Sequence, residues 1–295
     1  MRFTQRNLIL VCFFAFVGGC GIDSPAEKGR SAEKVVRGNL EGTSVSVDVQ
    51  STNGSIWVRA DPQAKRVSIE AIIQAGGTTA SEGKKRLAGS SLVSKVIDGT
   101  VQVRLKFPEP SFDSDGGRIT IIVPELRAVD ATSTHGRITI SNANGKVDIA
   151  TTNGAVDVAS CTEHVKAYTT NGKITVRDCL ADMSLKTLEG DVLVRQAIKA
   201  VTAVTKNGSI EVYCADQGAG PVNLESSNAD IKLECGQSFK GSIRMKTVDG
   251  KVKIIDPEKR AKMVKSESAT GVVVMGEGDQ SKITTTNGTV QVVIR

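Results

Sequence analysis

Hydrophobic and polar residues alternate along most of the chain, and over residues 151–212 the alternation repeats at a constant interval. Four segments there read TTNGAVDV, TTNGKITV, TLEGDVLV and TKNGSIEV; they start at Thr151, Thr169, Thr187 and Thr205, each 18 residues after the one before. In every segment the second and fourth residues after the glycine are apolar, and the residue between them varies. Alternation with a period of two and one apolar face predicts a half-buried β-strand.

Related segments extend this pattern in both directions. They are STNGSIWV at Ser51, STHGRITI at Ser133, SSNADIKL at Ser226, TVDGKVKI at Thr247, SATGVVVM at Ser268 and TTNGTVQV at Thr285. A second alternating stretch precedes the glycines, as with Val147 and Ile149 before Gly154. Each repeat therefore predicts two short strands that meet at an Asn-Gly corner. The interval lengthens to 21 residues between Thr205 and Ser268, which we interpret as longer turns between strands.

The constant interval favours a stack of coils over a meander of hairpins. A meander also uses Asn-Gly turns, but it has no reason to keep the same residue types in phase. Coils stacked ~4.8 Å apart do, because each side chain then lies above its equivalent in the next coil. We predict an all-β fold: a parallel β-solenoid with coils of ~18–21 residues, two strands per coil and a thin aliphatic core. About ten to twelve coils would form a rod roughly 50 Å long.

The Asn-Gly positions lie where the two strands of each coil meet. Asn and Gly tolerate the left-handed backbone that a tight corner needs, so we interpret them as structural turns rather than as a chemical motif. The corner residues are Asn53, Gly54, Gly136, Asn153, Gly154, Asn171, Gly172, Gly190, Asn207, Gly208, Gly250, Gly271, Asn287 and Gly288.

One segment interrupts the strand pattern near the N-terminal end of the repeats. Thr79 and Glu82 have the spacing of a helix capping box, and apolar residues from Leu87 to Val96 fall on about one helical face. We therefore expect a single solenoid domain over residues 41–295 with a helical insertion at about 78–97 that covers this end. The chain stops at Arg295, three residues after Val292, which predicts an uncovered coil at the other end.

The N-terminus has the features of an export signal. Arg2 and Arg6 precede an apolar run from Leu8 to Val17, which is too short to span a bilayer and typical of a signal-peptide core. Residues 1–19 are thus a predicted signal peptide. The following Val-Gly-Gly-Cys resembles the lipobox of bacterial lipoproteins, which implies cleavage before Cys20 and acylation of its thiol. Residues 20–40 are small and polar, and we expect a flexible tether there.

The implied lipid anchor gives an expectation for location. The protein would be held in the bacterial cell envelope, with the membrane as a partner through the acyl chains on Cys20. Glycine rather than aspartate after the cysteine favours the outer membrane, by analogy with the sorting rule of some bacteria with two membranes. An ordinary signal peptide with a chance cysteine is the alternative interpretation.

Composition and spacing argue against several functional classes. Aromatic residues make up 3% of the chain and its charges are interspersed, so no nucleic-acid partner is expected. The hexapeptide pattern of acyltransferases fails because stepping by six from Val147 meets Asn153. The calcium-binding β-roll pattern fails because Asp157 is followed in phase by Thr175. We expect no cofactor, no metal site and no enzymatic activity.

The two histidines and the single tryptophan carry no clear chemistry. His135 occupies an asparagine position at a corner and His164 lies in a turn; neither has a second ligand at metal-binding spacing. Trp57 lies at an outward position, and we expect the inserted helix to bury it, with glycan stacking as the alternative.

Four cysteines remain after the signal peptide and Cys20, and they fall into two pairs. Cys161 and Cys179 are 18 residues apart, and Cys214 and Cys235 are 21 apart, the local repeat in each case. Stacked coils would place the Cα atoms of each pair ~4.8 Å apart, within the range that a disulfide spans. Export to an oxidising compartment therefore predicts bridges Cys161–Cys179 and Cys214–Cys235. Four buried, reduced thiols are the alternative.

The repeated T-x-N-G-x-I/V-x-V, the passage from RITIIVP to STHGRITI and the insertion before it resemble a family of bacterial β-strand-repeat lipoproteins called "putative adhesin". The resemblance covers about residues 45–295. It implies a solenoid, with right-handed coiling as a modest preference, and it transfers no catalytic residue. Family membership alone does not give function.

These features lead to three hypotheses for function. The first is a non-enzymatic, lipid-anchored envelope protein whose rigid solenoid binds a protein or glycan partner. The second is a structural element that self-associates through the uncovered C-terminal coil. A polysaccharide-acting enzyme is the remote third, since Asp157, Asp191 and Glu211 are predicted to face outward without forming a phased cluster.

Overall fold

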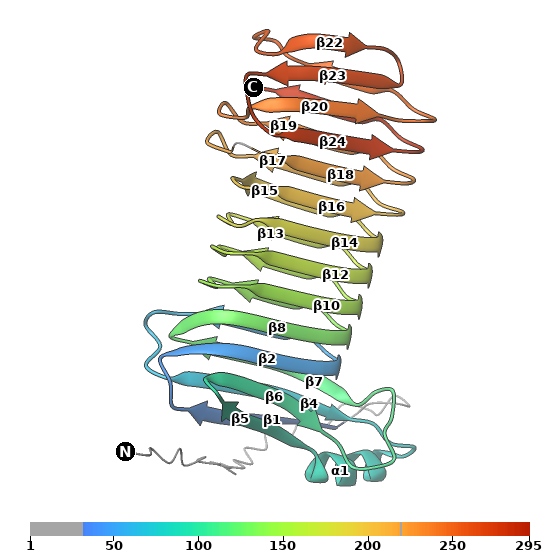
Figure 1. Cartoon of the computed structure of the whole chain (residues 1–295). Coiled ribbons are helices and arrows are strands. Elements are labelled where there is room, and N and C mark those ends of the chain that lie inside the picture. The colour runs from blue at the N-terminus through green and yellow to red at the C-terminus, as the bar shows by residue number, and fades with distance from the viewer. Residues whose placement is uncertain (1–31, 219) are drawn as a thin grey trace.

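The computed structural model describes residues 32–218 and 220–295, and over these residues it is an elongated stack of strands with one helix (Figure 1). The strands form two sheets that face each other across a thin core. Sheet A has the order β1 (Ala32–Leu40), β4 (Val67–Ala75), β7 (Gly116–Val123), β3 (Ile56–Ala60), β9 (Ile138–Ser141), β11 (Val156–Ala159), β13 (Ile174–Arg177), β15 (Val192–Ala197), β17 (Ile210–Cys214), β19 (Ile231–Cys235), β25 (Val290–Ile294) and β21 (Val252–Ile255). Sheet B has the order β22 (Lys262–Ser266), β23 (Thr270–Met275), β20 (Gly241–Lys246), β24 (Gln280–Thr285), β18 (Val222–Ser226), β16 (Val201–Thr205), β14 (Met183–Glu189), β12 (Val165–Asn171), β10 (Val147–Asn153), β8 (Glu125–His135), β2 (Ser44–Asn53), β6 (Thr100–Lys106) and β5 (Ser91–Ile97).

The middle of the stack confirms the predicted parallel β-solenoid. Thr151 of β10 is paired with Thr169 of β12, and Val156 of β11 with Ile174 of β13, so one 18-residue repeat is one coil. Both strands of each coil are parallel to their neighbours in the coils on either side. The predicted inward residues are buried; Val156 and Ile174 have no exposed surface.

Hydrogen bonds between coils hold the corners together. The hydroxyl of Thr169 donates to the carbonyl oxygen of Gly154 in the preceding coil at 3.0 Å, and Thr187 donates to Gly172 at 3.1 Å. The side-chain amide of Asn171 donates to that of Asn153 at 2.7 Å. The Thr and Asn columns are therefore ladders, because each repeat supplies both the donor and the next acceptor.

Glycine is required at these corners chiefly for close approach between coils. A Cβ atom on Gly154 would lie 1.9 Å from the carbonyl oxygen of Gly136, and one on Gly172 would lie 2.0 Å from that of Gly154. The expected left-handed conformation of the corner asparagines is wrong. The left-handed non-glycine residues that recur every 18 positions, Asn142, Ser160, Asp178 and Gln196, lie at the opposite corner, where sheet A returns to sheet B.

The N-terminal end of the solenoid begins earlier than expected. The predicted tether over residues 20–40 is wrong for its last nine residues, because Ala32–Leu40 forms β1 at the edge of sheet A. β1 pairs antiparallel with β4 over its whole length, from Ala32 with Ala75 to Leu40 with Val67. Backbone pairing and burial of Leu40 fix this strand although its sequence has little apolar pattern. The predicted signal peptide and Cys20 lie outside the described residues.

The inserted helix α1 (Ala80–Gly89) is shorter than the predicted insertion at 78–97. Its start is as predicted: Thr79 caps it and accepts from the backbone N–H of Glu82 at 3.1 Å. The following Ser91–Ile97 forms β5 instead of helix, because it pairs antiparallel with β6 through a tight turn at Asp98 and Gly99, both with positive φ. Across the described part of the chain, no helix is long and apolar enough to cross a membrane.

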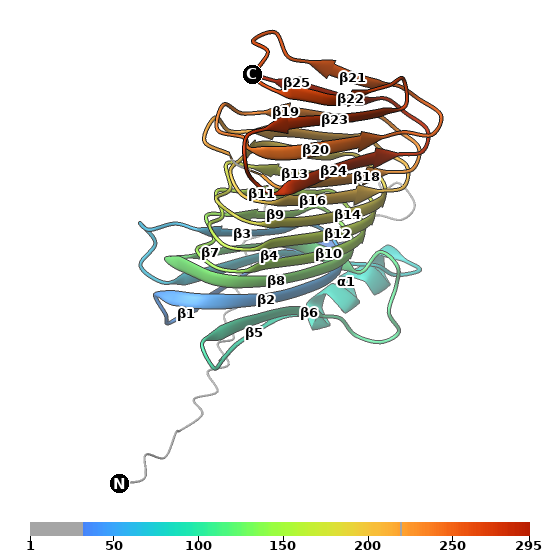
Figure 2. The ribbon, with the colours of Figure 1, turned by 45° about the horizontal axis from the view of Figure 1, so that its top comes forward.

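The C-terminal end does not follow chain order, and the predicted uncovered C-terminal coil is wrong. The last two strands, β24 and β25, lie inside the stack: β24 pairs with β18 and β20 (Figure 1), and β25 pairs with β19 and β21 (Figure 2). The stack ends instead at β21 in sheet A and at β22 in sheet B. Gly271 is correspondingly not a corner, because it lies within β23, antiparallel to β20 and opposite Met245.

Candidate binding groove

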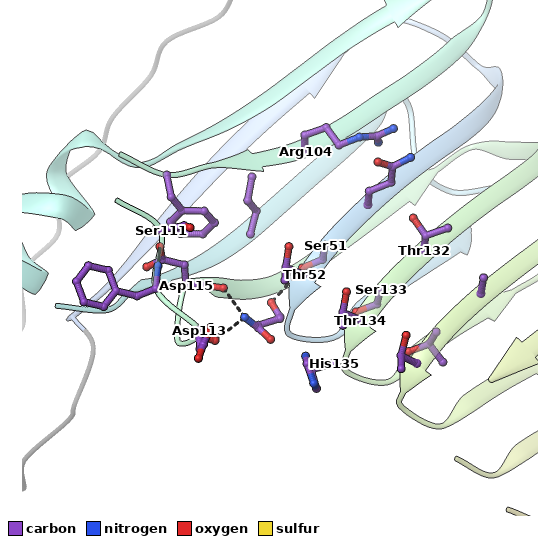
Figure 3. Close-up of a pocket in the computed structure, with 18 of the residues that line it drawn as sticks. Ser51, Thr52, Arg104, Ser111, Asp113, Asp115, Thr132, Ser133, Thr134 and His135 are labelled. Atoms are coloured by element: carbon purple, nitrogen blue, oxygen red, sulfur yellow. Dashed lines mark hydrogen bonds between the residues drawn. The ribbon is translucent and has the colours of Figure 1, made fainter. Parts of the chain in front are cut away.

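A groove with a volume of about 980 Å³ lies near the N-terminal end of the stack (Figure 3). Its floor is the outer surface of sheet B close to the corners of β2, β8, β10 and β12, and its wall is the segment from Arg104 to Asp115. The principal residues of the floor are Gln50, Thr52, Thr132, Thr134, Ala150, Thr152 and Tyr168, and those of the wall are Arg104, Leu105, Phe107, Ser111, Phe112, Asp113 and Asp115. We call this site the groove.

The repeat places the floor residues in two rows across the strands. Gln50, Thr132, Ala150 and Tyr168 occupy one row, since each is paired with the next in the strand register. Thr52, Thr134 and Thr152 form the second row, two positions along, and all three are exposed. The floor is therefore a flat surface of hydroxyl groups with one aromatic ring at its far end.

The wall is fixed to α1 by a buried ion pair. Two guanidinium nitrogens of Arg86 donate to the two carboxylate oxygens of Asp115 at 2.7 and 2.6 Å, and both side chains are about 6% exposed. Arg86 also donates to the carbonyl oxygens of Gly76, Pro108 and Pro110, and its guanidinium lies 4.4 Å from the centroid of the Phe112 ring. One arginine thus ties the helix to the middle and the C-terminal end of the wall.

A second set of bonds connects the wall to the floor. The side-chain amide of Asn53 donates to the backbone oxygens of Asp113 at 2.7 Å and Asp115 at 2.8 Å (Figure 3). Asn53 is the first corner asparagine, so at this end of the ladder its amide binds the wall and not another coil. The groove is held open by the same residue type that stacks the coils elsewhere.

The cations at the groove are already neutralised. Arg104 donates to both carboxylate oxygens of Asp48 at 2.8 Å and to the Asp48 backbone oxygen at 2.9 Å. Arg86 is bound to Asp115, as described. Both guanidinium groups therefore have carboxylate partners, and the groove lacks a free positive charge to attract an anion.

The carboxylates do not form a hydrolytic pair. Burial opposes ionisation of Asp115, but hydrogen bonds from Arg86 and from the backbone N–H groups of Phe112 and Gly76 outweigh it and lower the pKa of this carboxyl. Asp115 is therefore ionised and fully hydrogen-bonded, which prevents it from acting as a general acid. Asp113 is exposed, and glycoside hydrolysis normally needs two carboxyl groups in acid and base or nucleophile roles.

Two hydroxyl groups beneath the floor lack the bond that their equivalents make. The side-chain oxygens of Ser133 and Thr151 are buried without a hydrogen-bond partner, whereas Thr169 in the next coil donates to a glycine carbonyl. The corner of the first coils is thus less tightly bonded than the middle of the stack.

Beside the groove, three carboxylates stack on the outer face of sheet B. Asp48, Asp130 and Asp148 are paired in register on β2, β8 and β10. Partial desolvation, followed by repulsion from Asp48 and Asp148, raises the pKa of Asp130. Within residues 32–218 and 220–295, no cluster of three His, Cys, Asp or Glu side chains could hold a metal ion.

The four core cysteines are stacked as predicted but are free thiols, so the two expected disulfides are not present. The backbone N–H of Cys161 donates to the sulfur of Cys179 at 3.3 Å. Each of these thiols donates to a carbonyl two residues earlier, Cys161 to Ala159 and Cys179 to Arg177. Burial raises the pKa of Cys214 to about 12, which keeps it protonated.

The remaining predicted residues are dispersed. His135 lies at the edge of the groove, paired in register with Asn53 and Asn153, and His164 lies in a turn away from it. Trp57 is 41% exposed on sheet A with Arg59 5.4 Å from its ring, so the expected burial under the helix is wrong. Sequence reasoning missed Arg86, Asp115 and Tyr168. Only Tyr168 could have been found, as the exposed aromatic residue in phase with Thr132 and Ala150.

Comparison with solved structures finds several chains with a similar structure. The structure is similar to a "putative adhesin" from Bacteroides fragilis, with 12% identity, TM-score 0.47 and coverage of 89% of this chain and 97% of that chain. It is also similar to a "putative lipid binding protein" from Parabacteroides distasonis, with 12% identity, TM-score 0.36 and coverage of 88% and 96%. These similarities are too low to carry a functional argument. No curated protein matches the chain.

The sequence itself matches a described family. The match is to Toastrack DUF4097 and extends over residues 83–294, from α1 to the last residue of β25. Since this range is well over half of the chain, the protein belongs to the Toastrack DUF4097 family.

Proposed function

We propose that this protein is a non-enzymatic, lipid-anchored component of the bacterial cell envelope that binds a protein or glycan partner, in the manner of an adhesin. The observation that carries this proposal is the groove: a large concavity on the side of a solenoid, lined by hydroxyl, amide and aromatic side chains. The Arg86–Asp115 ion pair fixes the wall of the groove. Asp115, the groove carboxyl whose pKa is lowered, is bound in that pair. Such a site can bind a partner but has no groups arranged to cleave it.

The anchor supports a location for the partner. Acylation of Cys20, preferentially in the outer membrane, would leave eleven residues between the anchor and β1, and this segment can span at most about 40 Å. β1 starts at Ala32, paired with Ala75, and the next residue, Gly76, donates its N–H to Asp115 of the wall. The tether would therefore emerge beside the groove, and the groove would face components close to the membrane.

The proposal is tested by blocking the groove sterically. Full-length protein on beads is mixed with native envelope vesicles, and the retained vesicles are measured for wild type, Thr134→Trp and Thr175→Trp. Thr134 is exposed on the floor, and Thr175 is the matched outward threonine on sheet A. We expect retention to be lost only in Thr134→Trp. Absence of retention by the wild type, or equal retention by all three proteins, contradicts the proposal.

The self-association hypothesis loses its basis in this topology. The terminal coil in the chain, β24 and β25, is covered on both sides, and the edge strand β22 carries Lys262 and Lys265 with a register shift between Met263 and Lys265. Edge lysines and bulges are devices that oppose strand addition.

A further inference from the structure

The spacing of the exposed threonines sets the first requirement on the ligand. Thr52, Thr134 and Thr152 present one hydroxyl per coil, so equivalent donors and acceptors recur every ~4.8 Å along the stack. Tyr168 follows on the next coil, with 36% of its surface exposed. A ligand complementary to this floor offers several hydroxyl or amide groups in sequence and one apolar face for the ring.

Charge excludes anionic ligands. Arg104 is bound to Asp48 through two bonds of 2.8 Å, and Arg86 is buried against Asp115. The exposed carboxylate of Asp113 remains on the wall and would repel a phosphate, sulfate or uronate. A neutral molecule meets no such repulsion.

The strand pairing excludes an extended peptide that adds to the sheet. Strand addition needs an edge with unpaired backbone groups. β2, β8, β10 and β12 are each paired with a strand on both sides, so the floor offers side chains only. A polyhydroxylated ligand can use those side chains without any backbone contact.

We infer that the groove binds a neutral glycan chain that runs along the stack across the floor. This inference rests on the proposed function, in which the groove is the binding surface. Hydroxyl groups of successive sugars hydrogen-bond with Thr52, Thr134 and Thr152, and the apolar face of one pyranose ring packs on Tyr168. Tyrosine suits this position because it gives a large, rigid contact with little conformational entropy to lose.

The test uses full-length protein on a printed panel of neutral gluco-, manno- and chito-oligosaccharides, with oligogalacturonate and dextran sulfate as anionic probes. Neutral oligosaccharides should be retained and the anionic ones should not. Tyr168→Ala should weaken binding about tenfold, and Thr134→Val about threefold, the loss expected for one ring contact and one hydrogen bond. Tyr213→Ala and Thr175→Val are matched controls on sheet A and should leave the affinity unchanged.

The outcomes separate this inference from the proposed function. Binding of the anionic probes alone, or an equal effect of Tyr168→Ala and Tyr213→Ala, overturns the glycan inference. If no panel member binds, the envelope vesicles are treated with periodate, which destroys sugar diols, or with protease. Retention that survives periodate and is lost with protease overturns the glycan inference and leaves the proposed function standing. Absence of vesicle retention overturns both.

Discussion

The insertion of the last coil into the stack predicts an unusual pattern of stability. Val290 lies five residues before the end of the chain, yet it is paired with Ile231 on one side and Val252 on the other and has no exposed surface. Val252, the strand partner of Val290 that comes earlier in the chain, lies on the outermost strand of sheet A and is half-buried. Val290→Ala and Val252→Ala are therefore the same chemical change in a buried and an end coil.

The size of the difference follows from burial. Val290→Ala removes two buried carbon atoms, worth about 1.6 kcal/mol by transfer, and a cavity between two coils raises the cost to about 2–3 kcal/mol. Val252→Ala removes half-exposed atoms and should cost about 1 kcal/mol. Urea unfolding of both full-length variants, followed by circular dichroism, measures the two losses. Stacking in chain order would put Val290 in the exposed end coil. A larger loss for Val252→Ala than for Val290→Ala would therefore refute the inserted arrangement.

Three further predictions concern the column residues. Burial and two neighbouring carboxylates raise the pKa of Asp130, so its carboxyl group binds a proton more tightly in the native state than in the unfolded state. Above its folded pKa the charged carboxylate therefore lowers the stability of the native state. Asp130→Asn should thus raise the melting temperature at pH 7, with the gain shrinking as the pH falls through that pKa; a loss at pH 7 would contradict this. Gly172→Ala places a Cβ 2.0 Å from the Gly154 carbonyl and should cost about 1–3 kcal/mol, whereas Gly38→Ala, whose Cβ meets only Ser94 at 3.7 Å, should be nearly neutral in the same unfolding assay. The cysteines are counted by alkylation without reductant followed by mass spectrometry. Four thiols of the solenoid should react in denaturant and none in the native state. Two intact disulfides would contradict the thiol arrangement.

The regular part of the fold could be predicted because each coil repeats the same physical solution. Thr151 and Thr169 are equivalent in sequence, so their pairing follows from the 18-residue interval alone. The order of coils at the ends could not be predicted in this way. The pattern around Val290 fits any place in the stack, and the interval does not say which coil it neighbours. The insertion is seen only in the pairing of β24 with β18 and β20 and of β25 with β19 and β21. Beyond them only β23 runs antiparallel to the stack.

The extent of the helix and the groove show two other limits. Leu92 and Val96 are four residues apart, a spacing that puts two residues on one face of a helix and also on one face of a strand. Pairing with β6 decides for the strand. The groove depends on Arg86 reaching Asp115 across 29 residues, and nothing in the local sequence links them. By contrast, Thr132, Ala150 and Tyr168 could be aligned from the repeat, so the floor was predictable where the wall was not.

The most direct test of the central claim is site-specific photo-crosslinking in native cells. A photoreactive amino acid is placed at position 134 on the floor of the groove or at position 175 on the opposite sheet of the full-length protein. The account predicts a discrete adduct from position 134 and none from position 175, with the adduct lost when the Arg86–Asp115 pair that holds the wall is disrupted by Arg86→Met. Equal adducts from both positions, or an adduct from position 175 alone, would contradict the groove as the binding surface.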